Sequence, residues 1–431
     1  MPIRLDTREK DFTARFDAFL AVKREVASDV EAAVRAIIAD VAKRGDRALV
    51  ELSKKFDRAD LQKTGIKVLP AEIDAAFASI DAKTRSALEF AKERIDAHHR
   101  RQPLEDLHYT DALGVELGHR WTPIEAVGLY VPGGTAAYPS SVLMNALPAK
   151  IAGVERLVIA VPAPDGKLSP LVLAAARLAG VSEIYRVGGA QAIAALAYGT
   201  ETIAPVAKIV GPGNAYVAAA KRLVFGKVGI DSIAGPSEVL VLADSGANPD
   251  WIAADLLAQA EHDTAAQSIL VTPDLKLAEA VGRAVERQLQ SLPRAEIAGK
   301  SWRDFGAVIL VREMDEALVL IDRLAPEHCE IIADDADRLA TRVRNAGAIF
   351  IGAHTPEAIG DYVGGSNHVL PTARAARYAS GLSVLDFMKR TSILKCGLVQ
   401  LEKLAPAAIA LGRAEGLEAH ARSLEMRLKR D

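Results

Sequence analysis

From about residue 120 onward the sequence alternates short apolar runs with helical segments, and this alternation limits the fold more than any other feature. A first series begins with a strand that runs into a Gly-rich turn within 124–134; further strands are expected at 156–161, 183–187, 207–210 and 228–230, and helices at 169–179, 190–198 and 214–225. A second series has expected strands at 238–243, 268–272, 306–311, 330–333 and 348–351, and expected helices at 249–262, 274–290, 314–324 and 336–345. Short apolar strands separated by helices of about ten residues are typical of parallel β-α units buried on both faces. The sequence therefore predicts an α/β protein with two doubly wound, Rossmann-like sheets in succession.

Helical periodicity marks both ends of the chain. Apolar residues recur at three- and four-residue spacing in 12–26, 29–44 and 71–99, and helix is expected again over 400–428. Turn signals dominate 352–385. We expect the first helical block to pack against the second sheet.

Composition narrows the class of protein further. A chain of 431 residues exceeds one ordinary hydrophobic core, so roughly two to four domains are expected. The net charge of −3 gives no electrostatic reason to expect nucleic acid or an anionic membrane as a partner. The only cysteines, Cys329 and Cys396, indicate a reducing compartment rather than a disulfide framework. Because the sequence shows neither an apolar signal core nor the ~20 apolar residues of a membrane span, we expect a soluble, cytoplasmic protein.

A candidate half of a metal site lies at the end of the helix expected at 249–262. Asn248 can cap this helix and Pro249 suits its first position. Gln259 and His262 are three residues apart, so they share one helix face and offer an amide oxygen and an imidazole nitrogen. Zinc needs about four donors, and spacing alone favours an ordinary solvated surface for this pair.

Two Gly-rich turns lie where a strand ends and a helix begins, at 188–191 and 211–214. Ligands bind at these carboxyl ends in open α/β sheets, and helix N-termini suit phosphates. The usual dinucleotide fingerprint, G-x-G-x-x-G followed by an acidic residue, is missing from both turns. Glycines also make tight connections, so phosphate contact and a purely structural turn remain equal alternatives here.

Further polar residues could complete a metal site. Asp361, Gln259, His262 and His420 together would make a sound zinc shell of oxygen and nitrogen donors, although each alone is more often an ordinary polar residue. Glu327 and His328 form an acid–imidazole pair, and a histidine with a pKa near ~6.5 suits removal of a hydroxyl proton at neutral pH. Neighbours in a strand point to opposite faces, so both could reach one substrate only if a turn intervenes.

Eight segments together resemble the histidinol dehydrogenase family over nearly the whole chain. They are Gly-Leu-Tyr-Val-Pro-Gly-Gly at 128–134, Gly-Gly-Ala-Gln-Ala-Ile at 188–193, Gly-Pro-Gly-Asn-Ala-Tyr-Val at 211–217, Ala-Gly-Pro-Ser-Glu at 234–238, Ala-Gln-Ala-Glu-His at 258–262, Pro-Glu-His at 326–328, Ser-Asn-His-Val-Leu-Pro-Thr at 366–372 and Glu-Gly-Leu-Glu-Ala-His at 415–420. Each segment is weak alone, but all eight in this order are specific.

The resemblance implies a zinc- and NAD-dependent homodimer that oxidises L-histidinol through L-histidinaldehyde to L-histidine, the last two steps of histidine biosynthesis. It implies that zinc is bound by Gln259, His262, Asp361 and, across the dimer interface, His420, and holds the imidazole and amino nitrogens of the substrate. Substrate contacts match Ser237, Gln259, His262, His328, Asp361, Glu415 and His420, and NAD contacts match Tyr130, Gln191 and Asn214. His328 matches the general base and Glu327 the residue that activates water, whereas His368 has no assigned role.

The resemblance also implies a division into domains. The expected parts are an N-terminal helical arm at 1–26, a discontinuous α/β domain at 27–129 and 238–382 with most zinc, substrate and catalytic residues, an inserted NAD-side domain at 130–237, and a C-terminal tail at 383–431 that completes the partner's site. Ser366 stands at a position that varies in the family and puts none of these roles in doubt.

Three other functions stay open at this point. A paralogue on the same scaffold could oxidise another amino or sulfo alcohol with NAD and zinc. A zinc hydrolase could use Glu327 to activate a metal-bound water, and such an enzyme would need no NAD. A non-catalytic metal-binding protein would not need Glu327 and His328 beside the zinc shell.

Overall fold

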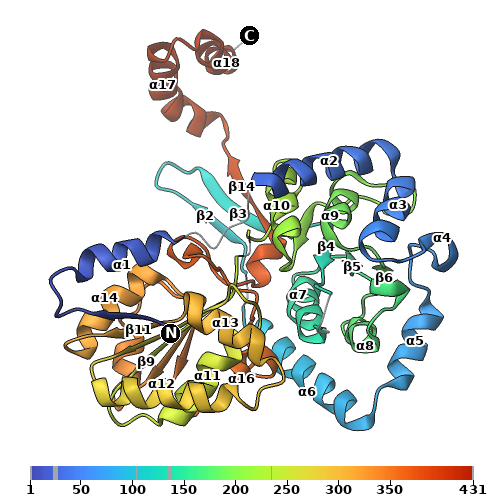
Figure 1. Ribbon diagram of the computed structural model, residues 1–431. Helices are drawn as coiled ribbons and strands as arrows, with labels where there is room; N and C mark the ends of the chain where they lie inside the picture. Colours follow the sequence, from blue (N-terminus) through green and yellow to red (C-terminus); the bar gives the residue numbers. More distant parts are fainter. Residues whose placement is uncertain (1, 23–27, 103, 134–137, 234, 430–431) are drawn as a thin grey trace. The chain divides into compact units, whose positions relative to one another are not determined.

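The computed structural model describes residues 2–22, 28–102, 104–133, 138–233 and 235–429 (Figure 1). The backbone divides into two compact units. One unit comprises Met1–Arg101 and Glu125–Asp386, and the other comprises Gln102–Ile124 and Phe387–Asp431. Within the described ranges, no helix has both the length and the apolar character needed to cross a membrane.

A six-stranded sheet in the first unit combines the second predicted series with one N-terminal strand. Its strands are β1 (Ile3–Asp6), β9 (Glu238–Ala243), β10 (Gln267–Thr272), β11 (Ala307–Leu310), β12 (His328–Ile332) and β13 (Ala348–Ile351). All neighbours pair in parallel, in the order β1-β11-β10-β9-β12-β13. Along β9 the side chains alternate: Leu240 and Leu242 enter one core, whereas Val239 and Val241 enter the other. The sheet is therefore buried on both faces.

Helices cover both faces of this sheet (Figure 1). One face packs against α1 (Phe12–Ala21), α14 (Met314–Leu324) and α15 (Ala336–Ala340), and the other against α11 (Pro249–Ala260), α12 (Leu275–Leu289) and α13 (Ala295–Phe305). The side chain of Asn248 accepts a hydrogen bond from Asp250 N at 2.9 Å, so α11 begins at the cap that the sequence predicts.

A five-stranded parallel sheet is formed by the first predicted series. Its strands are β4 (Ala126–Tyr130), β5 (Arg156–Ala160), β6 (Glu183–Tyr185), β7 (Lys208–Val210) and β8 (Gly229–Ile230), in the order β6-β5-β4-β7-β8. Numbered along the chain this order is 3-2-1-4-5, and β11-β10-β9-β12-β13 repeat it in the other sheet. The helices between the strands are α7 (Pro139–Ile151), α8 (Pro170–Leu178), α9 (Gly189–Tyr198) and α10 (Ala215–Val224).

The first helical block divides between the two sheets. Its first helix, α1, packs on the six-stranded sheet as predicted. The rest of the block packs on the five-stranded sheet, so for these helices the prediction is wrong. They are α2 (Ser28–Arg44), α3 (Asp46–Phe56), α4 (Leu61–Thr64), α5 (Pro70–Ser79) and α6 (Ala82–His99). Val34, Val41 and Leu49 share one core with Ile193 of α9, whose many alanines allow close approach. Helices α5 and α6 contact α8 and α7. Apolar periodicity shows that a helix has a buried face, but not which surface covers it.

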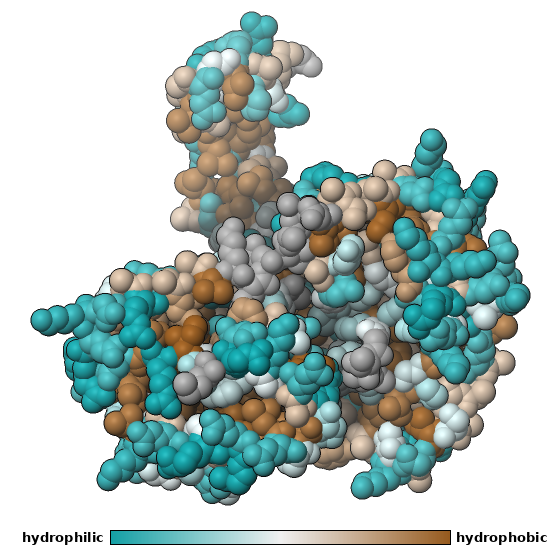
Figure 2. Space-filling view, in the orientation of Figure 1, coloured by the Kyte–Doolittle hydropathy of each residue, from teal (hydrophilic) through white to brown (hydrophobic). Residues whose placement is uncertain are grey.

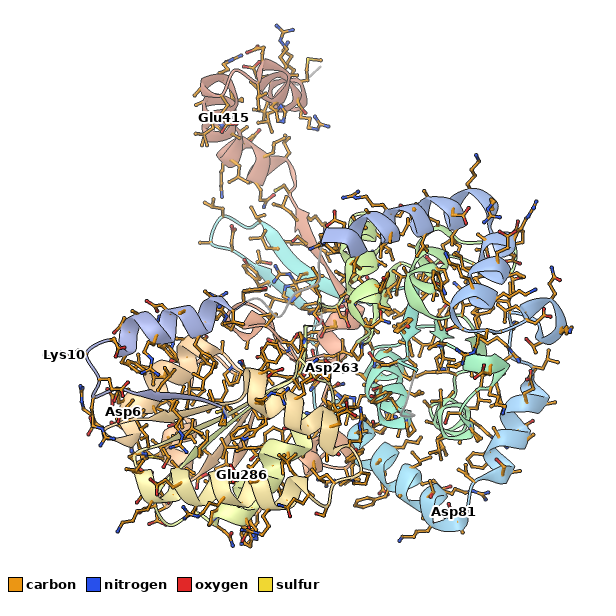
Figure 3. All side chains as sticks on the ribbon, in the orientation of Figure 1. Asp6, Lys10, Asp81, Asp263, Glu286 and Glu415 are labelled. Carbon is orange, nitrogen blue, oxygen red and sulfur yellow. The ribbon has the colours of Figure 1, made fainter. Side chains whose placement is uncertain are left out.

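The predicted fold class is confirmed, but several elements differ from the sequence-based expectation. The elements that were not predicted include β1, α7, α13, α16 (Glu357–Tyr362) and the three strands at 107–110, 116–123 and 388–395. The run at 71–99 is two helices, because Asp81 begins α6 by accepting a hydrogen bond from Thr84 N at 2.9 Å (Figure 3). Helix α16 is only six residues long, which is too short for a periodic signal.

The second unit holds three antiparallel strands and two helices. The strands are β2 (Leu107–Thr110), β3 (Glu116–Pro123) and β14 (Met388–Lys395), and the helices are α17 (Leu398–Ala414) and α18 (Glu418–Leu428). The expected helix over 400–428 is broken at Gly416, whose φ of 74° lies in the left-handed region. Hydrophobic residues gather on α17 (Figure 2). The exposed large hydrophobic residues are Leu398, Val399 and Leu411 of α17, Leu417 between the helices and Met426 of α18.

Candidate active site

The predicted catalytic pair lies at the amino edge of the six-stranded sheet. His328 is the first residue of β12, and Glu238 is the first residue of the neighbouring strand β9. The general preference for carboxyl ends of parallel strands therefore does not hold for this sheet. Helices α11 and α16 each follow a strand and run back, so their last residues come to the amino edge.

The hydrogen bond of His328 fixes its tautomer. Its Nδ1 lies 3.0 Å from the carbonyl oxygen of Glu238, and because a carbonyl only accepts, Nδ1 carries the proton. The Nε2 atom is buried without a partner in the described chain, 3.9 Å from Oδ1 of Asp361. Burial lowers the pKa of His328 to about 4 against the opposing effect of Asp361, so the ring is neutral at pH 7. The structure thus presents an unprotonated Nε2 in a buried position.

Glu327 lies beside His328 although the two are adjacent in sequence. Its Oε2 accepts a hydrogen bond from Glu238 N at 3.0 Å and lies 3.8 Å from Nδ1 of His328. Glu327 precedes β12 and is therefore free of the strict alternation within the strand. The two side chains meet on the same residue of β9, and Ser237, which is half-buried, comes directly before it.

A group of possible metal-binding atoms surrounds the ring of His328. His328, Glu357 and Asp361 each offer one donor atom, and these atoms lie within 4.8 Å of one another. Asp361 belongs to the predicted set, whereas Glu357 does not. Glu357 is buried, and its pKa is raised because it lies away from water and close to Asp361 and further carboxylates. No sequence signal pointed to it, since it opens the short helix α16.

Gln259 is fully buried, and neither polar atom of its amide has a hydrogen-bond partner in the described residues. A buried, unpaired amide is costly, so the solvated-surface alternative does not apply to this residue. His262, one turn further along, is exposed and contributes by its charge to the lowered pKa of both His328 and His368. The unpaired amide of Gln259, the carboxylate of Asp361 and an imidazole are donors that fit a zinc ion.

His368 positions Asp361 through the main chain. Its Nδ1 donates to the carbonyl oxygen of Asp361 at 3.0 Å, and its Nε2 lies 3.4 Å from Oγ of Ser141 on α7. Nearby, Asn367 Nδ2 donates to the carbonyl oxygen of Met144 at 2.6 Å. The segment after α16 therefore joins the site to the five-stranded sheet and its helices.

Two predicted site residues belong to the second compact unit. Glu415 directly follows α17, at the turn before α18 (Figure 3), and His420 lies on α18. Both are exposed within that unit. The first unit holds the remaining predicted residues, including Asp361, His262 and Gln259.

The three predicted NAD-contacting residues lie at the carboxyl edge of the five-stranded sheet. Tyr130 ends β4, and its hydroxyl accepts a hydrogen bond from Gly189 N at 3.0 Å. Gln191 is buried in the first turn of α9. Asn214 caps α10, with its side-chain oxygen accepting from Tyr216 N at 3.0 Å.

The turn that carries Asn214 is held by a buried ion pair. Lys221 donates to Asp231 and, at 3.0 Å, to the carbonyl oxygen of Gly211, while Asp231 accepts from Gly211 N at 2.7 Å. A Cβ on Gly211 would lie 2.2 Å from the carbonyl oxygen of Tyr130, and its φ is +107°. Only glycine fits here, because the turn packs closely against the main chain of Tyr130.

Known proteins are similar to this chain in sequence and in fold. The family model described as histidinol dehydrogenase matches residues 21–428. Histidinol dehydrogenase of Bradyrhizobium diazoefficiens is 69% identical over 428 residues, covering 99% of each chain. That of Nitrobacter winogradskyi is 70% identical, covering 99% of this chain and 100% of its own. A crystal structure of histidinol dehydrogenase from Elizabethkingia anophelis matches with a TM-score of 0.94 at 35% identity, covering 99% of this chain and 98% of that one.

The two parallel sheets, the buried neutral histidine and these relatives together define an oxidoreductase. Within that class, the chain belongs to the histidinol dehydrogenase family. The resemblance drawn from the eight sequence segments is thereby confirmed.

Proposed function

We propose that this enzyme oxidises L-histidinol to L-histidine in two steps, with zinc and two NAD per product molecule, and so completes histidine biosynthesis. The observation that carries the proposal is the unprotonated, buried Nε2 of His328 beside Asp361. An alcohol oxidation needs a base at the hydroxyl, and a neutral imidazole with its proton fixed on Nδ1 meets that need. Both cysteines are free thiols, which suits the reducing cytoplasm.

Zinc would be held by Gln259, His262 and Asp361 of one subunit and His420 of the other. The unpaired buried amide of Gln259 supports this assignment. When bound, zinc would hold the imidazole and amino nitrogens of the substrate, so that the reactive aldehyde is retained between the two oxidations. Asp361 is also part of the triad with His328 and Glu357, but we assign His328 to proton transfer because a metal on its Nε2 would remove the base.

The catalytic steps divide between His328 and Glu327. His328 accepts the hydroxyl proton of the alcohol on Nε2, and Glu327 then accepts a proton from the water that adds to the aldehyde. His328 acts again as base for the resulting hydrate. Ser237 and Glu415 would bind and orient the substrate. Both bases are buried, which limits escape of the intermediate to water.

NAD would bind at the carboxyl edge of the five-stranded sheet, against Tyr130, Gln191 and Asn214. When bound, NAD accepts a hydride in each oxidation. The Gly211 turn and the N-terminus of α9 lie at this edge, and backbone N–H groups there would bind phosphate without the usual fingerprint.

The functional unit would be a homodimer in which each second compact unit contributes Glu415 and His420 to the partner's site. The exposed hydrophobic residues of α17, together with Leu417 and Met426, give that unit a surface suited to a subunit interface. We further propose the division into an arm at 1–26, a domain at 27–129 with 238–382, an inserted domain at 130–237 and a tail at 383–431.

The test is absorbance at 340 nm with zinc-loaded enzyme, NAD and L-histidinol, with histidine measured in parallel. We expect two NADH per histidine, and we expect turnover to be lost in His328→Asn and after chelation. A protein that binds zinc and NAD but leaves histidinol unchanged would instead be a paralogue acting on another amino alcohol.

A further inference from the structure

Asp57 is an acidic residue with an unsatisfied oxygen on the cofactor side of the five-stranded sheet. It follows α3 directly, and its Oδ2 is buried without a hydrogen-bond partner in the described chain. The main chain of Asp57 is fixed: its N–H donates to Ser53 O at 2.9 Å, and its carbonyl oxygen accepts from Asp165 N at 2.7 Å. A fixed backbone with an unpaired carboxylate oxygen leaves one polar group to be satisfied by a ligand.

Asp165, whose N–H binds the carbonyl oxygen of Asp57, lies in the loop that follows β5. Strand β5 is strand 2 in the 3-2-1-4-5 order of this sheet. In Rossmann sheets an acidic residue near the end of this strand binds the ribose hydroxyls of the cofactor. Residues 161–164, which follow β5, carry no charge. Asp165 is the next acidic residue, but both its carboxylate oxygens accept from Arg58, at 2.6 and 2.9 Å. Asp57 is thus an acidic residue beside this loop whose Oδ2 has no hydrogen-bond partner in the described chain. It comes from the segment after α3 and not from the end of β5 itself.

The same loop abuts the turn proposed to bind NAD. A Cβ on Gly188 would lie 2.3 Å from Pro162, which therefore touches the turn before α9. Tyr130 bonds the next residue of that turn, Gly189. The pKa of Tyr130 is raised to about 12, mainly by burial and in part by the negative charge of Asp57. Through this loop, Asp57 is connected to the edge of the sheet that carries Tyr130 and Gln191.

We propose that Asp57 accepts hydrogen bonds from the adenosine ribose hydroxyls of NAD and discriminates against NADP. The inference rests on the proposed binding of NAD at this edge. A carboxylate accepts from hydroxyl groups, whereas it repels a 2′-phosphate, which carries a charge of about −1.5 to −2. The neighbouring Arg58 is engaged by Asp165 and so does not offer a free cation to that phosphate.

The test is calorimetric titration of zinc-loaded enzyme with NAD, with NADP, and with an NAD analogue that lacks the adenosine 2′-hydroxyl. We expect Asp57→Asn to raise the Kd for NAD about tenfold or more and to narrow the gap between NAD and NADP. The control Asp60→Asn loses the same charge three residues away and should leave both Kd values unchanged. In wild type, the 2′-deoxy analogue should bind about tenfold more weakly than NAD; in Asp57→Asn the two should bind alike.

Several outcomes would overturn the proposal. One is a wild type that binds the deoxy analogue as tightly as NAD, a result that decides the matter even if Asp57→Asn fails to fold. Another is a folded Asp57→Asn with unchanged affinities for NAD and NADP. A wild type that binds no NAD would overturn the proposed function itself and this inference with it, so the two failures are distinguishable.

Discussion

His328 and Gln259 are both buried, yet their polar atoms are satisfied to different extents. His328 has one ring nitrogen bonded to the Glu238 carbonyl and one unpaired, whereas both polar atoms of the Gln259 amide are unpaired. Single residues with such unmet bonding capacity lower the stability of the ligand-free protein. They also supply the donor atoms that a metal or substrate can use.

Gln259→Leu should separate these two effects. Removing the unpaired amide should raise the Tm of the chelated protein, since an unsatisfied buried group costs about 1–3 kcal/mol. The same change should abolish tight zinc binding in a calorimetric titration. Ser268→Ala is the matched control, because Ser268 Oγ donates to Leu256 O at 2.6 Å: it should lower the Tm and leave zinc affinity intact. A Gln259→Leu variant that still binds zinc as tightly as wild type would refute the ligand assignment.

A second residue-level prediction concerns two carboxyl groups that share a hydrogen bond, the buried Glu330 and the half-buried Asp255. Burial is the main cause that raises the pKa of Glu330 to about 8 and that of Asp255 to about 6. The folded protein therefore holds protons that the unfolded chain has released above about pH 4.5. The contribution of these two carboxyl groups to the free energy of unfolding is therefore largest at low pH, and it is lost as the pH rises through about 6 for Asp255 and about 8 for Glu330.

Glu330→Gln should remove much of that fall, because the amide stays neutral at every pH. The Tm of the variant relative to wild type should increase by a few degrees between pH 5 and pH 8, measured by calorimetry on chelated protein. Equal pH profiles for the two proteins would show that Glu330 is already ionised when folded.

At the level of elements, the outcome of prediction depended on length and on local caps. Helix α11 could be predicted because Asn248 and Pro249 mark its start and a long apolar pattern continues it. That prediction placed Gln259 and His262 on one helix face. Helix α16 gave no such signal, so the sequence predicted Asp361 without its element and missed Glu357 entirely. The Gly-rich turns were located correctly, but the ion pair that supports one of them joins residues ten apart across the end of a strand.

Lys221 and Asp231 pair with each other, and each also binds a main-chain atom of Gly211, so together they hold the turn. Lys221→Met should leave Asp231 buried and uncompensated, which costs about 3–5 kcal/mol of stability. The double variant Lys221→Met/Asp231→Asn should recover part of this loss but still bind NAD more weakly, because Gly211 O loses its donor. Zinc affinity should be unchanged in both variants. Calorimetric Kd values for NAD and zinc test this, and normal NAD binding in the double variant would contradict it.

For the whole molecule, the sequence predicted two sheets but not which sheet each helix of the first helical block covers. The pattern of apolar residues in α2 and α3 is satisfied equally well by any apolar surface. In the structure, α2 and α3 pack against α9, whose alanine-rich face allows the helices to approach closely. The carboxyl-edge rule likewise predicted the cofactor side of the molecule but not a catalytic pair at the amino edge of the other sheet.

The shared active site can be tested by mixing two inactive variants. His328→Asn damages the site of its own subunit, whereas His420→Asn should damage the site of the partner. If sites are shared, random exchange of subunits should restore about one quarter of wild-type activity, since half the dimers are mixed and each has one intact site. Mass spectrometry of differently tagged subunits confirms that exchange has occurred. Absence of recovery after exchange would place both residues in the same site.

The use of opposite edges by the two sheets has a practical consequence. The connections that follow β9, β12 and β13 lie at the carboxyl edge of the six-stranded sheet, away from His328 at its amino edge. The one after β12 contains the exposed Asp334 and Asp335 and leads to α15, which carries none of the site residues. This connection is therefore the place to graft a reporter or an affinity label, because an insertion there would burden neither the chemistry nor the cofactor.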